Sequence, residues 1–303
     1  MIVESHQLTH RYNERLALDQ VSFRVAEGEI FGLLGPNGGG KSTLFRILAT
    51  LQRPASGTAT IGSFDILRQG DDVRKQIGVV FQTQSLDRKL TVDENLTAQG
   101  HLHGLHGKSL SDRISQVLQR LDLFNRRGDI VETLSGGLKR RAEIAKALLH
   151  RPRVLLMDEA STGLDPTARR ELWRFLSELR RDDGVTILLT SHILEEAEQC
   201  DRLALIHEGK LVTEGTPAAL KQRIGGDVVV LDSANSSDLA ARIQSQFAIE
   251  TQSMNGTVRI EIENGHRFIA QVIEAFPGAI ESVSLHKPTL EDVFVRETGA
   301  SLW

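Results

Sequence analysis

The sequence has little cysteine and no long apolar run, and each absence narrows the class of protein. Its single cysteine, Cys200, excludes an internal disulfide and any metal site built from several cysteines. A membrane-spanning helix needs about 20 consecutive apolar residues, whereas the longest unbroken apolar run here has four residues, as at 154–157. We therefore expect that the chain does not itself span a bilayer. Its first residues also lack the pattern of a secretory signal.

Neither sign of charge is in large excess. The 36 basic and 40 acidic residues leave a formal net charge of −4, so no overall positive field favours a nucleic-acid partner. With 40% hydrophobic residues, 303 residues are enough for one large domain and a smaller one. We expect a globular protein in the cytoplasm or on the inner face of the membrane, with no nucleic acid as partner.

Short β-rich runs alternate with helical patterns through residue 226. Four runs have the composition of buried strands: residues 29–34, 77–81, 154–158 and 186–191. This alternation predicts an α/β core with parallel strands. Between the second and third runs the strand signal disappears and apolar residues recur at helical spacing. We therefore predict a helical subdomain inserted at about residues 84–150.

The pattern changes after residue 226. Residues 227–303 give the order βαββαβ of a ferredoxin-like unit, followed by a last helix at about residues 289–298. Asn255 and Gly256 lie between two strand-like runs and supply the positive φ angles of a tight hairpin. The predicted organisation is a nucleotide-binding domain at residues 1–226 and a small α+β accessory domain at 227–303.

Residues 35–43, GPNGGGKST, match the phosphate-binding pattern G-x-x-x-x-G-K-S. Glycine has no Cβ, so this loop can curl around phosphate oxygens and direct backbone N–H groups and the positive end of the next helix at them. Lys41 is expected to reach the β and γ phosphates, and Ser42 to ligate Mg²⁺. The predicted nucleotide-binding residues of this loop are Gly35, Pro36, Asn37, Gly38, Gly39, Gly40, Lys41, Ser42 and Thr43.

Polar residues follow three of the predicted strands. Asp158 and Glu159 end one of them, at the edge where α/β sheets bind ligands. Asp158 is a candidate for Mg²⁺ coordination and Glu159 for the general base toward water. His192 ends another strand, where it can bond the γ-phosphate and position the water. Gln82 ends a third and is a candidate for contact with Mg²⁺ or water.

Ser135, Gly136 and Gly137 open a predicted helix in the stretch LSGGLKRRAEIAKALL. By itself the serine is an ordinary N-cap, but the exposed helix N-terminus also suits an anion. One nucleotide cannot easily contact this helix and the helix after Lys41 in a single chain. A second copy of the protein is therefore expected to supply it across an interface.

The order of these motifs resembles that in the nucleotide-binding domain of ATP-binding cassette (ABC) transporters. The motifs that carry the resemblance are residues 35–43, Gln82, LSGG, LLMDE, STGLD and His192. The resemblance covers about residues 1–226. It implies that ATP is sandwiched between the phosphate-binding loop of one protomer and residues 135–137 of the other. It also implies that Tyr12 stacks on adenine and that Asp165 lies in a loop linking the two sites. Binding of ATP then closes the dimer, and hydrolysis releases it.

Within that family, the chain is similar to ATPase subunits of the daunorubicin-resistance type. The stretches that carry this similarity are TGLDP, SLDRKLTVDEN, EGTPAAL and PTLEDVFVRETG. Such subunits work with separate ABC-2 type membrane permeases, generally as exporters. Residues 84–95 are then expected to receive the coupling helix of the permease. The cargo stays open among drug, lipid, polysaccharide and cofactor, because the translocation path lies in another polypeptide.

Three residues depart from the family pattern: Leu138 stands where glutamine is usual, Ala160 where proline is usual, and Gly39 where alanine or serine is usual. Alanine leaves the turn after Glu159 less rigid than proline would, which is expected to slow hydrolysis without removing a catalytic group. We predict an active ATPase. One alternative is a sensor or assembly module with little turnover. Another is a soluble ABC protein that acts on ribosomes or DNA, but such proteins carry two cassettes or long coiled coils.

Overall fold

The computed structural model describes residues 1–300. The chain divides into two compact units, Met1–Glu214 and Gly215–Trp303, and each has its own apolar core. The division comes before the expected boundary at residue 226, because α8 (Pro217–Gln222) packs against α11 (Leu290–Thr298) of the second unit.

A six-stranded sheet in the order β10-β9-β3-β8-β7-β6 forms the centre of the first unit. Its strands β3, β6, β7, β8 and β9 are paired in parallel, as the sequence predicts. Asp158 pairs with Thr190 and Leu34 with Ser191, so the carboxyl ends of β3, β7 and β8 meet at one edge. The bounds are β3 Ile30–Leu34, β6 Ile77–Val80, β7 Val154–Asp158, β8 Thr186–Ser191, β9 Arg202–His207 and β10 Lys210–Gly215.

A second sheet, in the order β2-β1-β4-β5, was not predicted from the sequence. It is antiparallel, and register shifts along β1 blur the alternation of buried and exposed residues that identifies a strand. The helix α1 (Lys41–Leu48) packs its apolar residues into a core shared with both sheets. The bounds are β1 Val3–Tyr12, β2 Arg15–Val25, β4 Ser56–Ile61 and β5 Phe64–Asp65.

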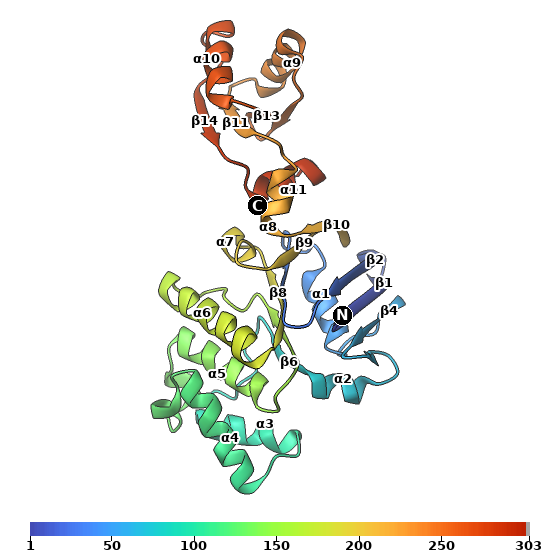
Figure 1. The fold of residues 1–303 in the computed structure, drawn as a ribbon, viewed down its shortest axis with the longest axis vertical. Coiled ribbons are helices and arrows are strands. Elements are labelled where there is room, and N and C mark those ends of the chain that lie inside the picture. The colour runs from blue at the N-terminus through green and yellow to red at the C-terminus, as the bar shows by residue number, and fades with distance from the viewer. Residues whose placement is uncertain (301–303) are drawn as a thin grey trace. The chain divides into compact units, whose positions relative to one another are not determined.

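The predicted helical subdomain is present. Figure 1 shows α3 (Val92–Leu102), α4 (Gly107–Arg120) and α5 (Gly136–Leu148) grouped together, in green shades. Their apolar faces share one core with residues of β7 and of the helix α6 (Pro166–Asp183). The unit also contains two short α-helices, α2 Gly70–Gln76 and α7 Leu194–Ala197, and two 3-10 helices, η1 Phe124–Arg126 and η2 Val131–Thr133. Within residues 1–300, no helix has the length and apolar character to cross a bilayer.

The second unit has the predicted element order. It runs β11 (Asp227–Asp232), α9 (Ser236–Phe247), β12 (Thr251–Met254), β13 (Thr257–Ile262), α10 (Gly265–Ala275) and β14 (Ser282–His286). Its antiparallel sheet has the order β12-β13-β11-β14 (Figure 1, orange to red). Asn255 and Gly256 have φ angles of 50° and 81° in the hairpin, which confirms that prediction.

Candidate nucleotide-binding site

The phosphate-binding loop connects the carboxyl end of β3 to α1. A Cβ on Gly35 would lie 2.2 Å from the carbonyl oxygen of Ile206, and one on Gly40 would lie 2.5 Å from that of Ala17. Gly40 also has a φ of 106°, which other residues rarely adopt. No side chain caps α1, so its first N–H groups are left for an anion. Packing within the protein thus requires both glycines, in addition to any need of a ligand.

Lys41 is directed back into this loop. Its side chain is 4% exposed, and Nζ donates to the carbonyl oxygens of Gly35 at 2.7 Å and Pro36 at 3.0 Å. Nζ also lies 3.7 Å from Oε1 of Glu159. Burial lowers the pKa of Lys41, and the carboxylates of Glu159 and Asp158 oppose that shift. The ammonium group therefore lies between the loop carbonyls and the acidic end of β7.

Asp158 is buried and accepts hydrogen bonds from two hydroxyl groups. Ser42 Oγ donates to Asp158 Oδ1 at 3.2 Å, and Thr190 Oγ1 donates to the same oxygen at 2.7 Å. Thr190 Oγ1 also accepts from the backbone N–H of Glu159 at 2.9 Å. A serine hydroxyl beside a carboxylate is a donor set that suits Mg²⁺, which is usually held by few protein oxygens together with substrate phosphates.

Thr190 was missed in the sequence analysis. Its position two residues before His192 was the available signal, because residues i and i+2 of a strand share one face. A hydroxyl on the face that carries a candidate catalytic histidine could have been considered with it. Arg15 was missed as well, and it donates from Nη2 to the carbonyl oxygen of Gly38 at 3.2 Å.

Two predicted residues converge on the carboxylate of a third, Glu159. Gln82 Nε2 donates to Glu159 Oε2 at 3.0 Å, and His192 Nδ1 lies 3.5 Å from Glu159 Oε1. They follow the carboxyl ends of β6, β7 and β8, which are adjacent strands. Glu159 is 7% exposed and has a φ of 47°, a left-handed conformation that is costly for a residue with a side chain.

A hollow of about 590 Å³ joins these groups to the phosphate-binding loop. Tyr12 lies on its wall, 41% exposed, with its hydroxyl donating to Gln52 Oε1 at 2.8 Å. An exposed ring at this wall is available to stack on a flat aromatic group. The lining also includes Asn37, Gly38, Gly40, Lys41, Ser42, Thr43, Gln82, Glu159 and His192. Pro36 and Gly39 form the turn behind it, with Gly39 N–H donating to Pro36 oxygen at 3.2 Å.

The remaining predicted residues lie elsewhere in the same unit. Ser135, Gly136, Gly137 and Asp165 line a different hollow of about 580 Å³. Ser135 caps α5 by accepting from the N–H of Leu138 at 3.4 Å. Asp165 caps α6, and its hydrogen bonds from the N–H groups of Ala168 and Thr167 hold its pKa below the usual value. One chain therefore does not bring these residues to its own phosphate-binding loop.

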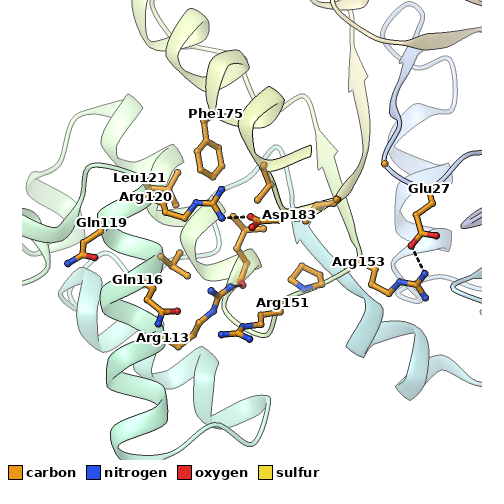
Figure 2. A pocket seen from close by; sticks show the side chains of 17 residues that line it. Glu27, Arg113, Gln116, Gln119, Arg120, Leu121, Arg151, Arg153, Phe175 and Asp183 are labelled. Carbon is orange, nitrogen blue, oxygen red and sulfur yellow. Dashed lines mark hydrogen bonds and ion pairs between the residues drawn. The ribbon is translucent and has the colours of Figure 1, made fainter. Parts of the chain in front are cut away.

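A larger hollow, of about 980 Å³, lies at the opposite edge of the six-stranded sheet, where β7 and β8 begin. Figure 2 shows its arginines, two of which are paired, Arg120 with Asp183 and Arg153 with Glu27. None of the predicted site residues lines it. Because α/β sheets bind ligands beyond the carboxyl ends of their strands, the smaller hollow beside Lys41 is the candidate nucleotide site.

Residues 18–162 match the family model described as ABC transporter. The chain belongs to the ABC transporter family. Residues 215–298 match a second model, described as the C-terminal domain of DrrA1-3-like ATP-binding proteins. These matches confirm the resemblance to ATPase subunits of the daunorubicin-resistance type.

Two relatives, both export or resistance ATP-binding proteins by name, match this chain over nearly their whole length. Daunorubicin resistance ATP-binding protein DrrA3 of Streptomyces coeruleorubidus is 37% identical, over 95% of this chain and 93% of that protein. Nod factor export ATP-binding protein I of Paraburkholderia xenovorans (strain LB400) is 38% identical, over 99% of this chain and 98% of that protein.

Solved structures agree with this assignment. An ATP-binding subunit of an ABC transporter superposes with a TM-score of 0.67 at 30% identity, covering 74% of this chain and 94% of that one. A dimeric ATP-binding cassette in a post-hydrolysis state, bound to ADP and phosphate, superposes with a TM-score of 0.64 at 27% identity, covering 71% and 98%. This ABC protein is accordingly an ATP-binding, ATP-hydrolysing subunit with the fold predicted from its sequence.

Proposed function

We propose that this ATPase drives export through a separate ABC-2 type membrane permease. It acts as a homodimer on the cytoplasmic side of the membrane, held there by the permease, and residues 84–95 receive the permease's coupling helix. The relatives named for daunorubicin resistance and for Nod factor export support the direction of transport. Drug, lipid, polysaccharide and cofactor remain the candidate classes of cargo.

Each site residue has a proposed role. Lys41 and the free N–H groups of α1 hold the β and γ phosphates, and Tyr12 stacks on the adenine. Ser42 and Asp158, with Gln82, hold Mg²⁺, which when bound offsets negative charge on the β and γ phosphates. Glu159 takes the proton of the attacking water.

The observation that carries the proposal is the convergence of Gln82 and His192 on the Glu159 carboxylate beside Lys41. A buried carboxylate oriented by neighbours on both sides can hold a water in line with a phosphate held by the lysine. His192 bonds the γ-phosphate from the adjacent strand end and fixes that geometry. Nothing in this cluster requires residues of the second unit.

Ser135, Gly136, Gly137 and Asp165 are proposed to act on the ATP of the partner subunit. They line a hollow that is separate from the hollow beside Lys41, and the Ser135 hydroxyl and the N-terminus of α5 suit a phosphate. In a two-fold dimer each protomer gives this face to its partner and receives the same face in return. ATP bound in the sandwich thereby links binding to closure.

The test replaces the general base. Glu159→Gln keeps the shape of the side chain and one accepting oxygen but cannot take a proton, so we expect hydrolysis to fall by about 100-fold or more. With Mg-ATP the variant should accumulate as a dimer with trapped ATP, measured by size-exclusion chromatography with multi-angle light scattering and by nucleotide analysis.

Glu27→Gln is the matched control, because Glu27 is exposed and pairs with Arg153 at the opposite edge of the sheet. It should leave both hydrolysis and association unchanged. Undiminished hydrolysis by Glu159→Gln would refute the general-base role, and a monomer saturated with Mg-ATP would refute the sandwich.

A further inference from the structure

Arg140 is a buried arginine in the second turn of α5 whose hydrogen bonds all go to backbone carbonyls. Its side chain is 8% exposed. Nη1 donates to the carbonyl oxygen of Phe81 at 2.8 Å, Nη2 to that of Glu159 at 3.2 Å, and Nε to that of Ala160. The guanidinium group thereby joins a helix of the helical subdomain to the two segments that carry Gln82 and Glu159.

The Glu159 backbone needs such a support. Its φ of 47° is a strained conformation that costs about 1–2 kcal/mol. Thr190 Oγ1 accepts from the N–H of Glu159, and Arg140 donates to its carbonyl oxygen and to the next one along the chain. Ala160 has no ring to restrict its own backbone. The hydroxyl and the guanidinium therefore fix the peptide groups on either side of this carboxylate.

The same arginine reaches the segment of Gln82. Phe81, whose carbonyl accepts from Arg140, immediately precedes Gln82, and the Gln82 amide bonds the Glu159 carboxylate at 3.0 Å. One turn further along α5, Glu143 accepts from the N–H groups of Ser85 and Leu86 at 2.5 and 3.0 Å. The helix thus holds both ends of the Gln82 to Glu159 contact.

We propose that Arg140 is a positioning residue for ATP hydrolysis, which sets the Glu159 carboxylate against Gln82 by binding the backbone of both segments. The inference rests on the proposed role of Glu159 as general base. Arg140 itself lines the hollow of Ser135 and not the one beside Lys41, so it acts on the reaction through Glu159.

The first test compares Arg140→Met with Arg140→Lys. Methionine removes all three donors, and a displacement of about 1 Å in a catalytic group can cost on the order of 100-fold in rate. We expect kcat to fall by about 10- to 100-fold, with KM for ATP and the affinity for fluorescent ADP within about twofold. Lysine keeps the charge and one donor group, so its kcat should lie between those of Arg140→Met and the wild type.

Arg113→Met is the matched control. Arg113 of α4 also donates to two backbone carbonyls, Leu149 at 2.9 Å and Leu148 at 2.7 Å, but at the far end of α5. It should lower the thermal unfolding temperature and leave kcat unchanged. If the Arg140 variants change kcat no more than Arg113→Met does, or raise KM in parallel with the loss of kcat, the inference is overturned.

The second test combines Arg140→Lys with Glu159→Gln, which also covers the case in which Arg140→Met does not fold. If Arg140 acts through Glu159, the double variant should hydrolyse ATP as slowly as Glu159→Gln alone, because the losses are not additive. Multiplied losses would mean that Arg140 acts independently and would overturn the inference. A normal rate in Glu159→Gln itself would instead refute the proposed general base, so the two failures are distinguishable.

Discussion

Thr190 shows how one hydroxyl can hold two acidic residues in place. Its oxygen donates to Asp158 and accepts from the N–H of Glu159, and the side chain is buried. Two consecutive carboxylates at a strand end would otherwise turn toward water. A buried hydroxyl in this position keeps the first carboxylate directed at Ser42 and fixes the peptide that leads into the second.

Thr190→Val tests this arrangement at the scale of one residue. Valine has the same shape, so the change removes only the hydroxyl and leaves a buried N–H and a carboxylate oxygen without this partner. We expect a loss of about 1–3 kcal/mol in the free energy of unfolding. The ATPase rate should also fall, and half-maximal activity should require more Mg²⁺.

Thr186→Val is the control on the same strand. Thr186 is buried at the other end of β8, where its hydroxyl accepts from the N–H of Gly28 at 2.9 Å. Urea denaturation should give a similar loss of stability for both variants, while only Thr190→Val changes the Mg²⁺ dependence of hydrolysis. Equal Mg²⁺ curves for the two variants would contradict the role assigned to Thr190.

At the scale of elements, the helical subdomain is joined to the six-stranded sheet beside β6. His150, just after α5, has Nε2 at 2.9 Å from the carbonyl oxygen of Ile77 at the start of β6. His103, at the end of α3, stacks on His150 with ring centroids 3.8 Å apart and an interplanar angle of 4°. Two stacked imidazoles repel each other when both are protonated, so this contact is stable only while at least one ring is neutral.

This stack predicts a pH dependence of stability. Burial, together with the nearby His103, lowers the pKa of His150 from 6.5 to about 4. Below pH 6.5 His150 binds a proton in the unfolded chain but stays neutral in the folded chain. The free energy of unfolding therefore falls as pH drops from about 6.5 to about 4, and below that it no longer changes through this group. The full loss is up to roughly 3 kcal/mol.

His150→Gln should remove most of that slope, as measured by urea denaturation between pH 7 and pH 4.5. His6→Gln is the control, because His6 is an exposed residue of β1 and is expected to leave the slope unchanged. A slope that is the same in wild type and His150→Gln would place the acid sensitivity elsewhere in the chain.

At the scale of the whole molecule, the nucleotide-binding unit has two separate hollows that the proposed function assigns to two different ATP molecules. One is lined by Lys41 and Glu159, the other by residues 135–137 and Asp165. Neither face is a complete site if ATP must be contacted on both sides. Completion then requires a second chain, and the dimeric cassette among the similar solved structures is consistent with this.

Mixing two inactive variants tests the composite site. Lys41→Ala damages the phosphate-binding loop, and Ser135→Arg blocks the face formed by residues 135–137. In a homodimer of either variant, both ATP sites therefore contain one damaged half. A mixed dimer has one site with both halves intact. With random pairing, half of the dimers are mixed, and we expect about a quarter of the wild-type ATPase rate.

Each variant alone should be inactive under the same conditions, and wild type diluted with Lys41→Ala serves to calibrate the exchange of subunits. If the mixture stays as inactive as its components while exchange is demonstrated, ATP is not shared between the two chains in the proposed way.

The sequence alone determined the local chemistry of this protein. Some features could be predicted because each depends on residue types at fixed short spacings. They are residues 35–43, the acidic pair at 158–159 and the βαββαβ order of the second unit. The hairpin at Asn255 is of the same kind, since its turn needs only two residues with positive φ.

Only the tertiary structure decided which side chains meet. Three features depend on pairings between residues far apart in the chain. They are the antiparallel sheet of β1 and β2, the hydrogen bond from the Thr190 hydroxyl to Asp158, and the hydrogen bond from the Arg140 guanidinium to the Glu159 carbonyl. Such contacts follow from strand register and helix packing. No local pattern of residues encodes them, because burying a polar group is favourable only when a distant partner satisfies it.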